Sequence, residues 1–290
     1  MERTIAPPRA DPHPPSTFTP PVGACDAHCH VFGPAARFPF APDRTYTPPD
    51  AGLEQFVRLQ ERLGLTRAVF VQASCHGTDN SAMVDALIRG RGRYAGVAML
   101  DDTVADEHIG ALHDAGVRGA RFNFVAHLGA APEMDSFWRV VDRISPFGWH
   151  VVLHFDAVDL PGYADVLDHL PVPFVIDHMA RVDASAGLDQ APFAFLRELA
   201  RDERAWVKIS GAERLTADGP PGYDDVVPFA RALIDVAPER ILWGTDWPHP
   251  NVRQMPDDGD LLDLLAAFAP DEAIRNGILV DNPMRLYDFI

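Results

Sequence analysis

The sequence predicts an α/β fold, a single (β/α)8 TIM barrel. Eight short segments rich in β-branched and apolar residues recur along the chain, and stretches with apolar residues three and four apart alternate with them. The length of 290 residues suits one such barrel, which takes about 250 residues. An open doubly wound sheet is the alternative. The nearest glycine-rich segment, GRGRYAG at 90–96, precedes a predicted strand instead of opening a helix, which disfavours a dinucleotide-binding fold.

The elements follow a regular order along the chain. Residues 1–22 contain seven prolines and little apolar material, which predicts a flexible arm that lies on the barrel or on a partner chain, before a catalytic barrel domain at 23–290. The predicted strands are 24–31, 67–74, 94–100, 119–125, 150–155, 174–179, 206–210 and 241–246. The predicted helices between them are 53–64, 79–90, 106–116, 134–144, 193–202 and 226–237. Several of these end in Gly, which suits a helix C-cap.

Composition excludes several classes of protein. The net charge of −17 argues against non-specific binding to nucleic acid or to an anionic membrane. No apolar run approaches the roughly 18 residues of a membrane span, and the N-terminus has no apolar signal core. Three cysteines cannot all pair, so we expect free thiols in a cytoplasmic enzyme. An anionic substrate would need a local group of Arg and His side chains inside this acidic shell.

Polar and titratable residues gather at the ends of the predicted strands, where (β/α)8 barrels carry their chemistry. A single buried histidine is usually a hydrogen-bonded core residue, but several strands that end in imidazole or carboxylate favour a functional site. Strand side chains alternate, so His28 and His30 are expected to point to the same side. The residues at the strand ends are His28, His30, His76, Arg121, Asn123, His154, Asp177, His178, Ser210, Arg214 and Asp246.

This pattern, His-x-His on the first strand, His on the fifth and sixth and Asp on the eighth, resembles the amidohydrolase superfamily. Longer segments look like 2-pyrone-4,6-dicarboxylate lactonases, from about Gly23 to Tyr287. They include DAHCHVFGP, VQASCHGTDNSAMVDA, DAGVRGARFNFV, GWHVVLHFDAVDLP, DHMAR, ERL and ILWGTDWPHPN. The resemblance implies a hydrolase that opens the cyclic ester of a small anionic lactone in the bacterial breakdown of lignin-derived aromatic compounds.

The resemblance also implies catalytic roles. Lactone hydrolysis needs an activated water and a stabilised oxyanion. Asp246 would accept the proton of the attacking water. His28, His30 and His178 would stabilise the carbonyl oxygen, directly or through a metal. The structural alternative for Asp246 is a carboxylate that only orders the WGTDWPHP turn.

Substrate-binding residues are implied in the same way. Arginine fits a carboxylate with two parallel hydrogen bonds, and two arginines match those that the family uses for its dicarboxylate substrate. Ordinary ion pairs are the structural alternative for both. The expected substrate-binding residues are Arg121, Arg214, Tyr46, Ser74 and His76.

Two positions depart from the pyrone lactonases. After RFNF the family carries a second basic residue, commonly in a Lys-Arg pair, where this chain has Ala126 and His127. His127 supplies a positive charge only when it is protonated, and its unperturbed pKa is about 6.5. His127 is also an expected substrate-binding residue. This departure admits a related lactone as the substrate.

The second departure concerns a metal. The metal-independent pyrone lactonases carry a tyrosine where this chain has His154, and a histidine there is a metal ligand across the wider superfamily. His28, His30, His154 and Asp246 would suit Zn²⁺ with an open position for water. His154 therefore favours a zinc-dependent enzyme similar to the 4-sulfomuconolactone hydrolases, and a metal-free site is the alternative.

Other functions are also compatible with the sequence. A lactone isomerase or a decarboxylase could use the same scaffold, because fold does not fix chemistry. A non-catalytic binding barrel predicts a missing or blocked carboxylate on the eighth strand, yet Asp246 is present. A Ser-His-Asp hydrolase is disfavoured because the chain has no G-x-S-x-G. The sequence leaves homo-oligomerisation open.

Overall fold

The computed structural model describes residues 4–289 and contains an eight-stranded parallel sheet in which each strand pairs with the next in the chain. All eight predicted strands are confirmed. Their bounds are β1 Cys25–Cys29, β2 Arg67–Val71, β3 Tyr94–Ala98, β4 Val117–Asn123, β5 His150–His154, β6 Phe174–Ile176, β7 Ala205–Lys208 and β8 Ile241–Leu242.

Backbone hydrogen bonds join the two ends of the sheet. The N–H of Ala27 donates to the carbonyl of Trp243 at 2.9 Å, and the N–H of Asp246 donates to the carbonyl of His28 at 2.8 Å. The predicted strand 241–246 was too long, because after Leu242 the chain continues beside β1 as an irregular segment. These bonds place the start of the WGTDWPHP segment directly beside His28.

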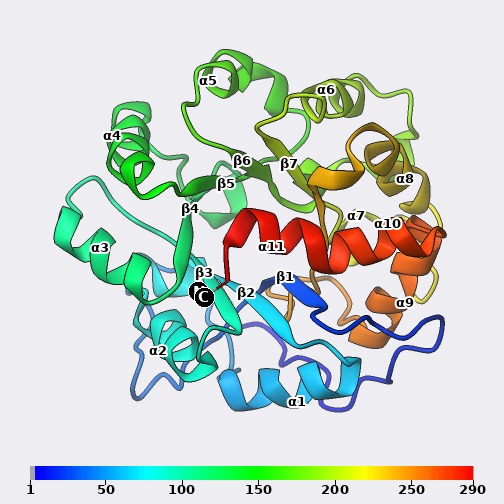
Figure 1. Ribbon diagram of the computed structural model, residues 1–290, viewed down its shortest axis with the longest axis horizontal. Coiled ribbons are helices and arrows are strands. Elements are labelled where there is room, and N and C mark those ends of the chain that lie inside the picture. Colours follow the sequence, from blue (N-terminus) through cyan, green and yellow to red (C-terminus); the bar gives the residue numbers. More distant parts are fainter. Residues whose placement is uncertain (1–3, 290) are drawn as a thin grey trace.

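Helices surround the strands (Figure 1). The six predicted helices are confirmed, as α1 Leu53–Leu63, α2 Ser81–Gly90, α3 Asp106–Asp114, α4 Met134–Ile144, α6 Ala191–Leu199 and α8 Val227–Val236. Five more were not predicted, namely α5 Ala164–Asp168, α7 Ala212–Leu215, α9 Asp258–Phe268, α10 Glu272–Asn276 and α11 Asn282–Tyr287. Most of these five are too short to show a clear helical period.

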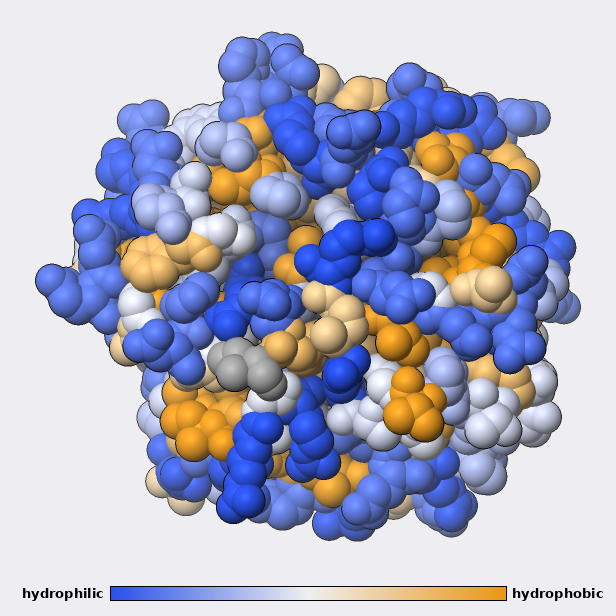
Figure 2. Space-filling model, in the orientation of Figure 1, coloured by the Kyte–Doolittle hydropathy of each residue, from blue (hydrophilic) through white to orange (hydrophobic). Residues whose placement is uncertain are grey.

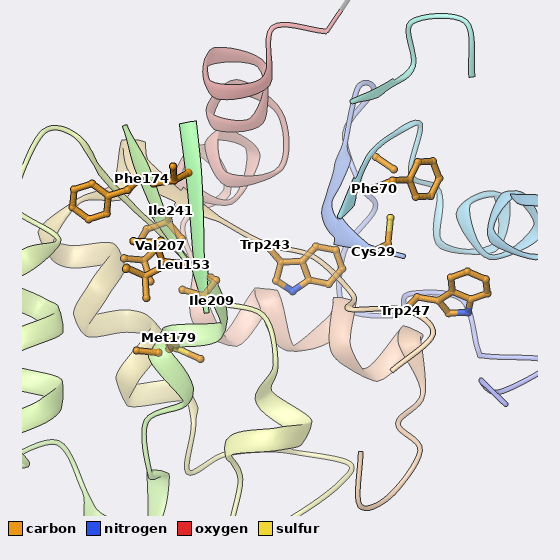
Figure 3. Close-up of a cluster of buried hydrophobic side chains, with 14 of the residues drawn as sticks. Cys29, Phe70, Leu153, Phe174, Met179, Val207, Ile209, Ile241, Trp243 and Trp247 are labelled. Atoms are coloured by element: carbon orange, nitrogen blue, oxygen red, sulfur yellow. The ribbon is translucent and has the colours of Figure 1, made fainter. Parts of the chain in front are cut away.

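The packing of α1 shows how the apolar pattern builds the outer layer. Its buried residues include Phe56, Leu59 and Leu63, three and four apart, so one face of the helix meets the sheet. The ring of Phe56 lies 5.0 Å from that of Phe70 on β2. Gly64 ends the helix with φ 73°, the left-handed C-cap that the sequence predicts. Figure 3 shows Phe70 with Cys29 and Trp247 in this part of the core.

The C-terminal helix closes the amino ends of the strands. Tyr287 of α11 is fully buried and belongs to a cluster with Cys25, Val69 and Val152 from the start and middle of the strands. Figure 1 shows α11 crossing the barrel, and Figure 2 shows the same face as mostly hydrophilic with separate hydrophobic patches. The carboxyl ends of the strands therefore lie at the opposite end of the barrel.

The proline-rich segment lies on the barrel. Ser16 and Thr17 donate hydrogen bonds to the carboxylate of Asp263 on α9, and His13 Nε2 lies 2.8 Å from Asp260 Oδ1. The flexibility of this arm stays a prediction. The three cysteines are free, as expected, and all three are buried. Among residues 4–289, no helix has the length and apolarity that a bilayer span requires.

Candidate active site

A cavity opens at the carboxyl ends of the strands; the space between its lining atoms, open solvent included, is about 370 Å³. It adjoins a second cavity of about 770 Å³, with which it shares Ser74, Arg121 and Leu128. Most of the residues proposed from the sequence meet here. The first cavity is lined by His30, Tyr46, Ser74, Arg121, His127, Leu128, His154, His178, Arg181, Arg214, Asp246, Pro250 and Asn251.

Asp246 lies at the base of this cavity with both carboxylate oxygens engaged. Oδ2 accepts two hydrogen bonds from Arg214, one of them from Nε at 2.7 Å. Oδ1 lies 3.1 Å from His30 Nε2 and 3.5 Å from His28 Nε2. Burial alone would raise the pKa of this carboxyl group, but the Arg214 guanidinium and the neighbouring imidazoles outweigh burial and hold the pKa well below its usual value. Asp246 is therefore ionised at neutral pH.

His28 and His30 converge on Asp246, as the sequence predicts. The register of β1 against β2 shifts between Asp26 and Cys29, and Asp26 Oδ1 accepts a hydrogen bond from the N–H of His28. Such irregularities re-aim side chains at the rims of barrels. His30 Nδ1 lies 2.7 Å from the carbonyl oxygen of Val71, which can only accept, so Nδ1 carries a hydrogen and Nε2 faces the carboxylate.

Below the cavity a buried lysine holds the ring of His28. Lys208 Nζ lies 2.9 Å from His28 Nδ1 and 3.0 Å from Asp177 Oδ1, and all three side chains are fully buried. Burial, and then the Lys208 ammonium, lower the pKa of His28 well below its usual value. His28 is therefore neutral. No role for Lys208 was predicted, although a lysine within the apolar segment WVKIS is an unusual feature that could have indicated one.

His178 reaches the cavity from the turn that follows β6. Its Nδ1 lies 2.9 Å from Ser210 Oγ, and its ring centroid lies 4.5 Å from that of His28. Burial lowers the pKa of His178 to about 4, so this ring is also neutral at pH 7. A neutral imidazole carries one N–H donor, which can stabilise a developing oxyanion without a net charge of its own.

One group of side chains could hold a metal ion within residues 4–289. Single ligand atoms of His28, His178 and Asp246 all lie within 4.8 Å of one another. Two imidazoles and a carboxylate fit a divalent cation such as zinc in donor type. This set includes His178 and lacks His30 and His154, so it differs from the set expected from the sequence.

His154 has a different partner. Two side chains face His154 Nδ1, Arg121 Nη2 at 3.2 Å and Asn123 Oδ1 at 3.4 Å. Because the guanidinium makes the shorter contact and can only donate, Nδ1 accepts. Burial, and then Arg121, lower the pKa of His154 well below its usual value. The hydrogen of the neutral ring is therefore on Nε2, a buried donor without a hydrogen-bond partner in the described part of the chain. This arrangement supports His154 as a hydrogen-bond donor in the cavity.

The expected arginines line the cavity, but other groups of the protein already hold several of their donors. Arg121 Nε donates to Asp177 Oδ2 at 3.2 Å. Arg214 Nη1 donates to the carbonyl of Pro250 at 2.7 Å, in addition to its two bonds with Asp246. Both arginines therefore position the site as well as supply positive charge.

The remaining expected residues divide into two groups. Tyr46 and Ser74 line the cavity, and burial raises the pKa of Tyr46, so its hydroxyl stays a donor. His127 also lines the cavity; it is exposed, but partial burial, and then Arg181, lower its pKa to about 4. His76 lies outside the cavity lining, because its Nδ1 faces the carbonyl of Pro39 and its ring packs on Phe40.

An ionised carboxylate, neutral imidazoles and guanidinium groups at the carboxyl end of a (β/α)8 barrel define a barrel enzyme. The chain belongs to the amidohydrolase family, whose model matches residues 25–289.

Two proteins with similar sequences are named as hydrolases. The chain is 49% identical to a 2-pyrone-4,6-dicarboxylate hydrolase of Comamonas testosteroni, over 93% of this chain and 92% of the relative. It is 46% identical to a 4-sulfomuconolactone hydrolase of Rhizobium radiobacter, over 95% and 93%. A crystal structure of a putative 2-pyrone-4,6-dicarboxylic acid hydrolase from Pseudomonas putida superposes with a TM-score of 0.82 at 33% identity, over 92% of this chain and 98% of that one.

Proposed function

We propose that this enzyme hydrolyses the ester bond of a small anionic lactone, of the kind for which its relatives are named. The observation that carries the proposal is the contact of the ionised Asp246 with His28 and His30 in a cavity that arginines line. A carboxylate that stays ionised can accept a proton from water. The arginines give an anionic substrate local positive charge in a protein whose net charge is −17.

The proposed reaction begins with water beside Asp246. As the water oxygen attacks the lactone carbonyl carbon, Asp246 takes one of its protons, and N–H groups of the cavity imidazoles stabilise the carbonyl oxygen as it gains negative charge. The bond between the carbonyl carbon and the ring oxygen then breaks, and the ring oxygen takes the proton back from Asp246, which is ionised again. The new carboxylic acid group releases its proton to solvent, so the products are a carboxylate and an enol or alcohol in one open chain.

The pairing of Asp246 with Arg214 affects this step. A carboxylate that a guanidinium holds is ionised at all working pH values but is a weak base. When Arg214 turns toward a carboxylate of the substrate, the pKa of Asp246 rises and proton transfer from water becomes easier. Substrate binding and activation of the base would therefore be linked.

A zinc ion on His28, His178 and Asp246 forms the second part of the proposal. When bound, zinc polarises the carbonyl group and lowers the pKa of a bound water. Elemental analysis of protein purified without added metal, followed by assay with and without a chelator, tests this. One equivalent of zinc whose removal abolishes activity supports the metal, and full activity of the metal-free protein overturns it.

The mass of the product tests whether the reaction is a hydrolysis. The purified enzyme is supplied with 2-pyrone-4,6-dicarboxylate or 4-sulfomuconolactone, and loss of the lactone is followed by absorbance and mass spectrometry. A product heavier by one water supports hydrolysis. A product of unchanged mass would indicate an isomerase, and release of CO₂ would indicate a decarboxylase, and either would overturn the proposal.

A further inference from the structure

A left-handed turn after β6 carries two side chains into the cavity. The four residues from His178 to Arg181 have φ between 50° and 52°. None of them is glycine, and left-handed backbone costs about 1–2 kcal/mol for each such residue. A run of this kind persists only where the surrounding structure imposes it, and such runs cluster at functional sites.

The two middle residues of the turn and its two ends have different surroundings. Met179 and Ala180 are fully buried and belong to the main hydrophobic core, where Figure 3 shows Met179 near Ile209. His178 and Arg181, at the two ends, both line the cavity. The core therefore anchors the turn, and the turn presents an imidazole and a guanidinium to the same space.

Arg181 is the cavity arginine with the most available donors. Its Nε donates to Asp156 Oδ1 at 2.6 Å, and within residues 4–289 its Nη1 and Nη2 have no hydrogen-bond partner. Arg214 is held through all three nitrogens, and Arg121 through Nε and Nη2. The Arg181 side chain is 27% exposed, so an incoming ligand can reach it.

Among the arginines that line the first cavity, Arg181 is the one that neither Asp177 nor Asp246 holds. His127 lies beside it but is neutral at pH 7, because burial and the Arg181 charge lower its pKa to about 4. The loop after β4 therefore supplies no positive charge in neutral solution. Asp156 fixes one edge of the Arg181 guanidinium and leaves the two terminal nitrogens for a planar or tetrahedral anion.

We propose that Arg181 is a specificity-determining residue that binds a second anionic group of the substrate, a carboxylate or sulfonate remote from the ester that is cleaved. The assignment rests on the proposed function for the identity of the substrate, but not for the binding of a dianion. It gives the turn after β6 two tasks: His178 acts at the carbonyl group, and Arg181 selects doubly charged ligands.

Binding of unreactive ligands tests the proposal independently of turnover. Affinities for benzene-1,3-dicarboxylate and benzoate are measured by calorimetry for the wild-type protein, Arg181→Met and Arg181→Lys. We expect Arg181→Met to weaken the dicarboxylate about 10- to 100-fold and benzoate less than about 3-fold, since a charge-assisted hydrogen-bond pair is lost. Arg181→Lys keeps the charge without the fork and should give an intermediate loss. Circular dichroism checks that each variant is folded.

Arg139→Met is the matched control, because Arg139 pairs with Asp102 on the surface, 55% exposed and outside the cavity lining. It removes the same charge and should leave both affinities unchanged. The assignment is overturned if Arg181→Met leaves the ratio of the two affinities unchanged. It is also overturned if the wild-type protein does not prefer the dicarboxylate to benzoate. If the wild-type protein shows the preference but hydrolyses no lactone, the proposed function fails and the role of Arg181 stands.

Discussion

The ammonium group of Lys208 contacts the ring of His28 beneath the active-site cavity, 2.9 Å from Nδ1. Asp177 lies within 3.0 Å of the same ammonium and also accepts from Arg121. Buried charges persist in a barrel only when they are paired, because each costs several kcal/mol without a partner. The cluster therefore fixes the orientation of His28 from below, while Asp246 contacts it from the cavity.

Lys208→Met should destabilise the protein by about 3 kcal/mol, because it leaves Asp177 with one cation instead of two in a buried site. Urea unfolding followed by circular dichroism measures this loss. The double variant Asp177→Asn/Lys208→Met should recover part of the stability, since it removes the uncompensated carboxylate as well. Additive losses in the double variant would contradict the pairing.

Asp246→Asn should lower kcat about 10²- to 10⁴-fold, the usual contribution of a general base, while ligand binding stays measurable. The amide cannot accept a proton from water, although it keeps the size of the carboxyl group. Steady-state kinetics with the best lactone substrate, beside calorimetric binding of benzene-1,3-dicarboxylate, separates the two effects. A turnover rate near that of the wild-type enzyme would show that another group is the base.

Arg214→Met should affect both kinetic constants. The sequence led us to expect mainly weaker binding, but Arg214 also donates twice to Asp246 Oδ2. We therefore expect KM to rise about 10-fold or more and kcat to fall by a similar factor. The comparison with Arg181→Met is informative, because that variant should raise KM for dianionic lactones with kcat nearly unchanged. A loss confined to KM in Arg214→Met would mean that its contact with Asp246 is dispensable.

The sequence predicted the barrel and much of its site, because apolar periodicity and strand ends are local features. All eight strands were predicted, and His28, His30, His178 and Asp246 do meet at one end. What local pattern could not show was the partner of each group. That Arg214 holds Asp246, across 32 positions of sequence, depends on how α7 packs against the segment after β8.

The backbone conformation of the turn after β6 could not be predicted from local sequence either. DHMAR reads as the end of an apolar strand, and the strand was predicted to continue to Met179. The chain instead turns at Asp177, because Met179 and Ala180 are drawn into the core in left-handed conformations that no local propensity favours. Arg181 therefore reaches the cavity by a tertiary effect.

His150 at the amino end of β5 makes stability depend on pH. It is 2% exposed, its Nε2 has no hydrogen-bond partner among the described residues, and burial, then the Lys208 charge, lower its pKa to about 3. In the unfolded chain the pKa returns to about 6.5. Between these values the unfolded state binds a proton that the native state does not, so the free energy of unfolding falls as pH falls below about 6.5. The slope for this group reaches about 1.4 kcal/mol per pH unit.

His150→Asn removes this titration and keeps a polar side chain of smaller size against the ring of Tyr287. Because the smaller side chain leaves space in the barrel, the free energy of unfolding of the variant is compared with its own value at pH 7.5. We expect the wild-type protein to lose about 2 kcal/mol more than the variant between about pH 7 and pH 4.5, measured by urea unfolding at each pH. Parallel curves for the two proteins would mean that His150 accepts a proton inside the folded barrel, and that its burial does not control acid stability.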